Sequence, residues 1–283
     1  MRSASIRNEV WRTAWALGCA LSATPAALGQ QATNVPAALQ PGQGSLIYRP
    51  QAFYFSFDDD RPGGLGEVDM LVSSHAFAYG VAPELTLIAE VPLVYVDTAT
   101  PDDDDFGVGD IDLTVQWRLL VDDPAPLETR RVVLIGGVEA PSFDDGFSSE
   151  SLDPFFGVST AWVDDRHAVN AAAVWQFNTQ GEVPLPVGFG SSSDESLALD
   201  AAYLYRIDPA SFAAGGTTSA FFQAQLLGRY ETGGDAELIA APGFIYNGPT
   251  WAVEAAVQVP LWQDIDGRAE LVWGINVGLR LLF

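Results

Sequence analysis

The last thirteen residues of the chain constrain its fold most, because their apolar side chains recur at every second position. One series is wholly apolar: Leu271, Trp273, Ile275, Val277, Leu279, Leu281 and Phe283. The intervening series is mixed, with small and polar members: Val272, Gly274, Asn276, Gly278, Arg280 and Leu282. Successive side chains of a β-strand point to opposite sides, so this alternation predicts an extended strand whose two faces meet different media.

Two folds use a strand of this kind. It resembles the closing strand of bacterial outer-membrane β-barrels, in which the apolar face meets lipid and the other face a polar lumen. An edge strand of a soluble β-sandwich also alternates. The rest of the chain has to decide between them.

About twelve segments alternate in the same way, which suits the even strand number of bacterial barrels. They cover approximately residues 45–57, 68–79, 84–97, 108–121, 130–141, 154–163, 167–178, 195–206, 218–231, 236–246, 250–261 and 269–283. In segment 108–121 an apolar series from Ile111 to Leu119 alternates with a polar series from Asp110 to Arg118. We therefore predict an all-β fold, a single transmembrane antiparallel up-and-down barrel that covers residues 44–283.

The connections between these segments alternate in length. Links after the odd segments are long and acidic, as in 58–67 and 98–107, whereas links after the even segments are mostly tight, as in 80–83. Long extracellular loops and short periplasmic turns are typical of an outer-membrane barrel. The register also sorts outward aromatic residues to two heights, as expected for interfacial girdles. These residues are Trp117, Trp162, Tyr203, Tyr205, Tyr246, Trp251 and Phe283 near the periplasmic ends and Tyr95, Trp175 and Tyr230 near the opposite rim.

Three prolines conflict with uninterrupted strands. Pro92, Pro242 and Pro260 fall within predicted segments, and proline cannot donate a ladder hydrogen bond. We expect bulges or early strand ends at these positions.

Charge and cysteine usage limit the partners and the compartment. The net charge is −24 although 48% of the residues are hydrophobic, and no lysine is present. Such acidity argues against nucleic acid as a partner, because phosphate binding needs clustered positive charge. The single cysteine, Cys19, lies in the first 29 residues, so the rest of the chain has no thiol for a disulfide or a thiolate metal site.

Residues 1–29 have the three regions of a secretory signal peptide. Arg2, Arg7 and Arg12 precede an apolar run, and small residues precede Gln30. An alternative is a lipoprotein signal in which Cys19 is lipidated. Residues 30–43 are polar and contain proline, which predicts a loose periplasmic extension, and the sequence leaves open whether they plug the lumen. No later run reaches the roughly 18 apolar residues that a membrane helix needs, so any crossing of a membrane uses strands.

Three stretches together carry a family resemblance. They are Tyr79–Leu87 (YGVAPELTL), Glu90–Val94 (EVPLV) and Phe106–Leu113 (FGVGDIDL). This pattern is similar to the outer-membrane barrels labelled "MetA-pathway of phenol degradation". The resemblance implies a transporter for aromatic or other small hydrophobic compounds, but it carries over no substrate-binding residue. We expect the glycines Gly107 and Gly109 to turn the chain at the barrel rim, because no helix follows to make a dinucleotide site.

The predicted inward positions suggest an ion-selective lumen. They include Glu90, Asp110, Asp112 and Glu254, with Arg118, Arg131, Arg206 and Arg280 at the periplasmic end. One interpretation is an acidic mouth above an arginine constriction that filters by size and charge. The other is structural pairing across the lumen, since a twelve-stranded interior is only modestly wider than one that side chains fill.

Two further groups of residues suggest a catalytic site and a cation-binding site. Ser73 and His75 share a face of one segment, with Glu90 expected opposite Ser73, and such a Ser-His-Glu set is used by hydrolases. We expect these side chains to point inward, where a polar lumen cluster is the simpler interpretation. The acidic loops, above all Asp102, Asp103, Asp104 and Asp105, have the ligand type that Ca²⁺ prefers, or they are solvated, or divalent ions bridge them to lipopolysaccharide.

The sequence thus predicts an exported integral protein of the bacterial outer membrane. The expected function is passive passage of small, aromatic or hydrophobic solutes, with no cofactor and no catalytic residue. A structural or adhesive barrel with cation-binding loops is the main alternative, and a barrel lipid hydrolase is the third. The expected partners are outer-membrane lipid, lipopolysaccharide, a small-molecule solute and divalent cations.

Overall fold

A computed structural model of the chain describes residues 30–36, 38–60, 66–98, 105–125, 127–142, 147–179, 194–211 and 218–283. The predicted signal peptide, with Cys19, lies outside the described residues. The described parts form β-strands joined by turns and loops, and none of them contains a helix long and apolar enough to span a membrane.

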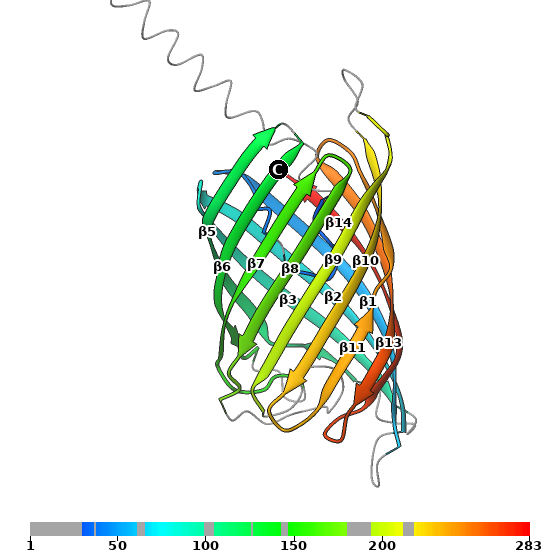
Figure 1. Cartoon of the computed structure of the whole chain (residues 1–283). Coiled ribbons are helices and arrows are strands. Elements are labelled where there is room, and N and C mark those ends of the chain that lie inside the picture. Colours follow the sequence, from blue (N-terminus) through cyan, green and yellow to red (C-terminus); the bar gives the residue numbers. More distant parts are fainter. Residues whose placement is uncertain are drawn as a thin grey trace, which may run out of the picture.

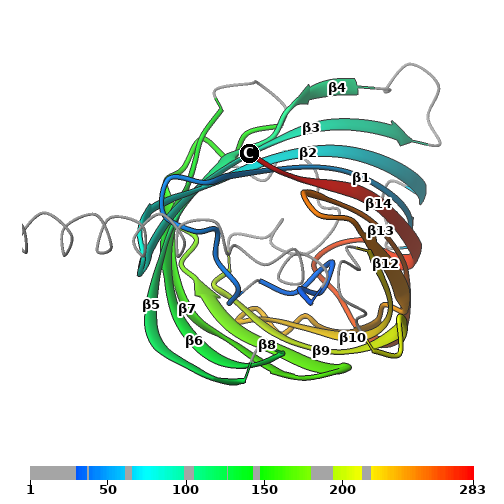
Figure 2. The ribbon, with the colours of Figure 1, turned by 90° about the horizontal axis from the view of Figure 1, so that it is seen from above.

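The strands form one closed antiparallel barrel (Figures 1 and 2). Within the described residues they are β1 (Leu46–Asp59), β2 (Gly66–Ala82), β3 (Leu85–Thr98), β4 (Asp105–Val108), β5 (Ile111–Ala125), β6 (Glu128–Ala140), β7 (Asp153–Asp164), β8 (His167–Gln176), β9 (Ser196–Asp208), β10 (Ser219–Glu231), β11 (Ala236–Ala240), β12 (Gly243–Asn247), β13 (Trp251–Asp264) and β14 (Glu270–Leu282). Strand β14 pairs with β1 from Ile47↔Leu282 to Asp58↔Glu270, which closes the ring.

Two of the twelve wall positions are each shared by two strands. Strands β4 and β5 both pair with β3, and strands β11 and β12 both pair with β10 and β13. The described strands therefore make a twelve-stranded barrel, which confirms the predicted fold class. Each predicted segment overlaps one wall position, and the segment predicted at 108–121 is β4 together with β5.

The interruptions lie at the prolines, as expected. Gly109 and Asp110 separate β4 from β5 beside Pro92, whose carbonyl oxygen accepts a hydrogen bond from the Gly109 amide. A Cβ on Gly109 would lie 3.1 Å from the Pro92 ring, so the close approach favours glycine there. Pro242 lies in the break between β11 and β12, and the register shifts where Ile239 lies opposite Pro260.

The outer surface of the wall is apolar and aromatic. Exposed aromatic residues near the end that carries the short turns include Trp117, Trp162, Tyr203, Tyr246 and Phe283, and near the end that carries the long loops they include Tyr95 and Tyr230. The other predicted girdle residues, Trp175, Tyr205 and Trp251, are partly exposed. We call these two ends the turn end and the loop end. Inner positions are buried and frequently polar, as in the alternation of β14 from Gly274 to Arg280. This distribution is typical of a barrel with lipid outside and polar groups inside.

One outer-face assignment from the sequence is wrong. Leu271 was expected on the outer face of the closing strand, but it is buried inside the barrel. The β1–β14 register shifts between Ser56 and Phe57, so that Ser56 pairs with Trp273 and Phe57 pairs with Leu271. The extra residue, Val272, reverses the side to which Leu271 points.

Candidate functional site

The N-terminal segment, residues 30–43 without residue 37, lies inside the barrel rather than outside it (Figure 2, blue). It enters at the turn end, where the Gly44 amide donates to the Gly80 carbonyl over 2.7 Å. Gln30, Gln31, Ala32, Thr33, Val35, Ala38 and Leu39 are buried. The periplasmic extension predicted for this segment is therefore wrong for its described residues. We call this stretch the lumen segment.

Side-chain amides of the wall bind the backbone of the lumen segment. The Ala32 amide donates to Asn170 Oδ1 (2.9 Å), the Thr33 amide to Gln223 Oε1 (3.0 Å) and the Asn34 amide to Gln225 Oε1 (2.8 Å). A buried backbone N–H needs a partner, and an irregular segment has no ladder to supply one. The inward side-chain amides of β8 and β10 thus supply the hydrogen-bond acceptors that a neighbouring strand would otherwise provide.

An ion cluster of Arg49, Glu254 and Arg280 binds the carbonyl groups of the same segment. Arg280 donates to the carbonyls of Gln31 (3.1 Å) and Ala32 (3.2 Å), and Arg49 donates to the carbonyl of Thr33 (2.5 Å). Both arginines pair with Glu254, and Glu254 and Arg280 are each only 1% exposed. Buried charges are tolerated when they are paired and hydrogen-bonded, so this cluster fixes the segment across the lumen.

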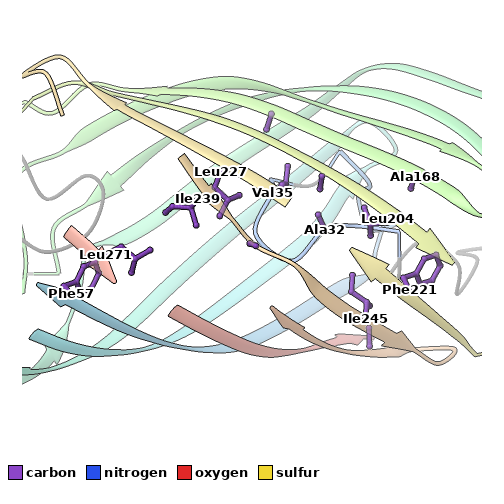
Figure 3. Packing of buried hydrophobic residues seen from close by; sticks show 14 of the residues in the cluster. Ala32, Val35, Phe57, Ala168, Leu204, Phe221, Leu227, Ile239, Ile245 and Leu271 are labelled. Atoms are coloured by element: carbon purple, nitrogen blue, oxygen red, sulfur yellow. The ribbon is translucent and has the colours of Figure 1, made fainter. Parts of the chain in front are cut away.

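Apolar side chains complete the packing of the lumen segment. Ala32 and Val35 belong to a buried cluster with wall residues such as Leu227 and Ile239 (Figure 3). Ala38 and Leu39 belong to a second cluster, which contains Val133, Ile135 and Ala161. The segment fills space that the side chains of a twelve-stranded wall leave open.

Two cavities lie along the lumen segment. The phenylalanine cavity, of about 450 Å³, is lined by residues that include Phe53, Phe55 and Phe57 of β1 and residues 33–36. The carboxylate cavity, of about 340 Å³, is lined by residues that include Glu90, Asp112 and Glu139. Pro36 and Arg49 line both cavities, so the segment and β1 lie between them.

The predicted acidic residues fall into three places, of which the ion cluster with Glu254 is one. Glu90 lies opposite Asp112, and Asp112 lies opposite Glu139, which forms a row of three carboxylates across β3, β5 and β6. Ser74 donates to Glu90 and Gln176 donates to Glu139, but no ion pair joins the row to a cation among the described residues. Asp110 instead caps the loop end, where it accepts hydrogen bonds from the amides of Ser142 and Ser149.

The four predicted arginines do not form one ring. Arg280 is in the ion cluster, and Arg206 is buried against Asp165 (2.7 Å) and the Pro209 carbonyl (3.1 Å). Arg131 pairs with Asp123 over 3.6 Å. Arg118 makes no ion pair within the described part of the chain. Their role in ion selectivity stays a prediction.

Ser73 and His75 point to the outer face, not into the lumen. Their strand β2 buries Ser74 at the intervening position, and Glu90 lies opposite Ala76 rather than Ser73. The predicted Ser-His-Glu set is therefore not formed. Instead, His75 Nδ1 lies 2.8 Å from the Tyr48 hydroxyl, and His75 Nε2 lies 3.2 Å from Ser73 Oγ. This network satisfies polar groups on an otherwise apolar surface.

The predicted metal ligands cannot be placed. Asp102, Asp103 and Asp104 lie outside the described residues, as does the side chain of Asp105. Among the residues that are described, no group of three or more acidic, histidine or cysteine side chains could hold a metal ion. Cation binding by the loops therefore stays a prediction.

Comparisons with known proteins bear on the fold. The barrel is similar to a COG4313 outer-membrane channel from Pseudomonas putida F1, at 14% identity and a TM-score of 0.58, over 89% of this chain and 99% of that chain. It is also similar to the β domain of the Bordetella autotransporter BrkA, at 12% identity and a TM-score of 0.50, over 85% and 100% of the two chains. Both are bacterial outer-membrane barrels. No family model and no curated protein matches the sequence.

Several residues of the site were not predicted. Arg49 and the inward phenylalanines of β1 carry a usable signal, because they alternate with the outward Tyr48 and Tyr54. The lumen segment carries less, since its amide-rich, proline-containing sequence is equally typical of a solvated loop. Its contacts lie on strands more than a hundred residues away, such as Asn170 and Gln223.

Proposed function

We propose that the chain is an integral outer-membrane channel through which small molecules pass down their gradients. The observation that supports this best is a closed barrel with an apolar outer surface and a polar interior that contains open volume. The outer surface suits lipid, and the interior offers hydrogen-bonding groups along a path for solutes. The similar barrels of Pseudomonas and Bordetella support the location. In this proposal no residue is catalytic and no cofactor is bound.

The finer part of the proposal concerns the solute. The phenylalanine cavity supports small aromatic or hydrophobic molecules, as the resemblance to the phenol-degradation transporters also implies. Lipopolysaccharide and divalent cations at the acidic loops are proposed as partners on the grounds of charge alone.

Liposome swelling tests the channel directly. Vesicles loaded with protein that lacks residues 1–29 should swell in sugars, amino acids and aromatic alcohols at rates that fall with solute size. Planar-bilayer recordings should show discrete conductance steps. The absence of both swelling and conductance, in this protein and in a form that also lacks residues 30–40, would exclude a channel.

The orientation of Ser73 and His75 favours one second candidate, lipid-ester hydrolysis. A serine hydroxyl next to an imidazole, with Tyr48 on the other ring nitrogen, faces the lipid side. Release of fatty acid from phospholipid micelles, abolished in Ser73→Ala and retained in Ser56→Ala, would support this activity. Absence of fatty-acid release by the unmodified protein would exclude it.

A further inference from the structure

A ladder of three phenylalanines forms one wall of the phenylalanine cavity. Phe53, Phe55 and Phe57 point inward from alternate positions of β1, and successive ring centroids are 5.9 Å apart. The first two rings are nearly parallel, with an interplanar angle of 15°. Flat rings favour stacked or edge-on contact at this spacing, so the wall presents aromatic surface to a ring-shaped ligand.

The remaining wall has both apolar and polar side chains, and its apolar members come from distant parts of the barrel. Met70, Leu227, Ile239 and Leu271 line it, together with Val35 and Pro36 of the lumen segment. Figure 3 shows Val35, Leu227, Ile239 and Leu271. A cavity of about 450 Å³ lies within the range of small-molecule sites and is roomy for one or two rings.

The charged groups that line the cavity are already paired. Arg49 pairs with Glu254, Arg229 with Asp200, and Glu237 with Arg268 over 3.0 Å. An anionic ligand entering the cavity would lose its hydration without gaining a free cation, and a cationic ligand would have to share the carboxylate of Glu237 with Arg268. The cavity therefore favours uncharged molecules.

Two buried polar atoms at the cavity have unmet hydrogen-bonding capacity. Glu237 Oε2 and Gln51 Nε2 have no hydrogen-bond partner among the described residues, and their side chains belong to residues 4% and 8% exposed. One is an acceptor and the other a donor. A hydroxyl group both donates and accepts, so it complements either atom, and unsatisfied buried groups gain most from such a partner.

We propose that the phenylalanine cavity binds an uncharged ring compound that carries a hydroxyl group, an aryl alcohol for example, and discriminates against ring compounds that carry a carboxylate or an ammonium group. This inference deepens the proposed channel function by naming the solute class. The ring stacks on the β1 ladder, and the hydroxyl group bonds to Glu237 or Gln51.

Binding of small ring compounds to the protein without residues 1–29, folded in detergent, tests the inference. This measurement does not depend on conduction. The probes are benzyl alcohol, toluene, benzoate and benzylammonium, each titrated by saturation-transfer NMR. Benzyl alcohol should bind at least about tenfold more tightly than either charged probe, the equivalent of one buried interaction of 1.4 kcal/mol. Its advantage over toluene should shrink in Gln51→Leu and in Glu237→Leu, because each removes one hydroxyl partner, and Arg268 keeps Glu231 as an ion-pair partner in the second variant.

Two matched variants control for stability. Phe55→Leu removes a ring from the cavity and should weaken benzyl alcohol severalfold, whereas Phe222→Leu removes a ring that pairs with Phe244 outside the lumen and should leave binding unchanged. Equal binding of benzoate and benzyl alcohol, equal effects of the two phenylalanine variants, or no saturable binding would each overturn the inference. Conductance without this selectivity would leave the channel intact, and selective binding without conductance would reject only the channel.

Discussion

The carboxylate of Glu254 lies between two arginines inside the barrel. Arg49 and Arg280 both pair with it, and its side chain is fully buried. Removing one partner of a buried ion pair leaves an uncompensated charge, which costs more than the pair itself contributes. The contribution of Glu254 to stability should therefore exceed that of any exposed carboxylate on the same barrel.

We expect Glu254→Ala to lower the free energy of unfolding by about 3–5 kcal/mol. Urea titration of protein folded into lipid vesicles measures this change. Asp122→Ala is the matched control, because Asp122 and Arg130 are both more than half exposed and 3.8 Å apart, and such a pair contributes about 0–1 kcal/mol. Equal losses in the two variants would contradict a stabilising role for the buried cluster.

Arg118 and Arg131 test the predicted charge filter at the turn end. Arg118 has no ion-pair partner in the described parts of the chain, and loss of Arg131 would free the carboxylate of Asp123. Arg118→Ala together with Arg131→Ala should raise single-channel conductance and shift selectivity toward cations, since positive charge is removed and negative charge is released. Arg130→Ala, on the exposed surface, should change neither quantity. Unchanged single-channel behaviour in the double variant would remove the filter hypothesis.

At the scale of single elements, the lumen segment shows where sequence patterns stop being informative. Strands were predictable because alternation is local. About ten residues of sequence are enough to show which side chains share a face of the strand. The lumen segment has no period, and amide side chains on β8 and β10 and the ion cluster determine its position. The local sequence pattern does not show β-bulges either, which is why Leu271 was assigned to the wrong face of β14.

Removing residues 30–40 should open the lumen. We expect the deletion to raise conductance severalfold while the circular dichroism spectrum stays that of a β-barrel, because the wall closes through β1 and β14 without this segment. Unchanged conductance would show that the segment does not limit the pore.

A variant that keeps the lumen segment but weakens its attachment separates the effect of detaching the segment from the effect of deleting it. Asn170→Ala, Gln223→Ala and Gln225→Ala together remove three wall acceptors that bind the amides of the lumen segment. This triple variant should increase conductance, but less than the deletion of residues 30–40 does. Gln176→Ala, at the carboxylate row, keeps these acceptors and is the control.

At the scale of the whole molecule, the interior is asymmetric. The phenylalanine cavity has paired charges and aromatic walls, whereas the carboxylate cavity has three adjacent acidic groups without an ion pair among the described residues. The alternation of each strand predicted which residues point inward, but not how the lumen segment would divide them. The two cavities therefore offer different chemistry to a solute inside one barrel, aromatic in the first and acidic in the second.

The carboxylate row should make the channel cation-selective. A row of acidic groups in a narrow lumen attracts cations and repels anions over a Debye length of about 8 Å at physiological salt. In a potassium chloride gradient the reversal potential should indicate preference for potassium, and Glu90→Gln, Asp112→Asn and Glu139→Gln together should move it toward zero. Glu128→Gln, exposed at the turn end, should leave it unchanged. A reversal potential that does not respond to the triple variant would mean that small ions bypass this cavity, and the phenylalanine side of the lumen would then have to carry them too.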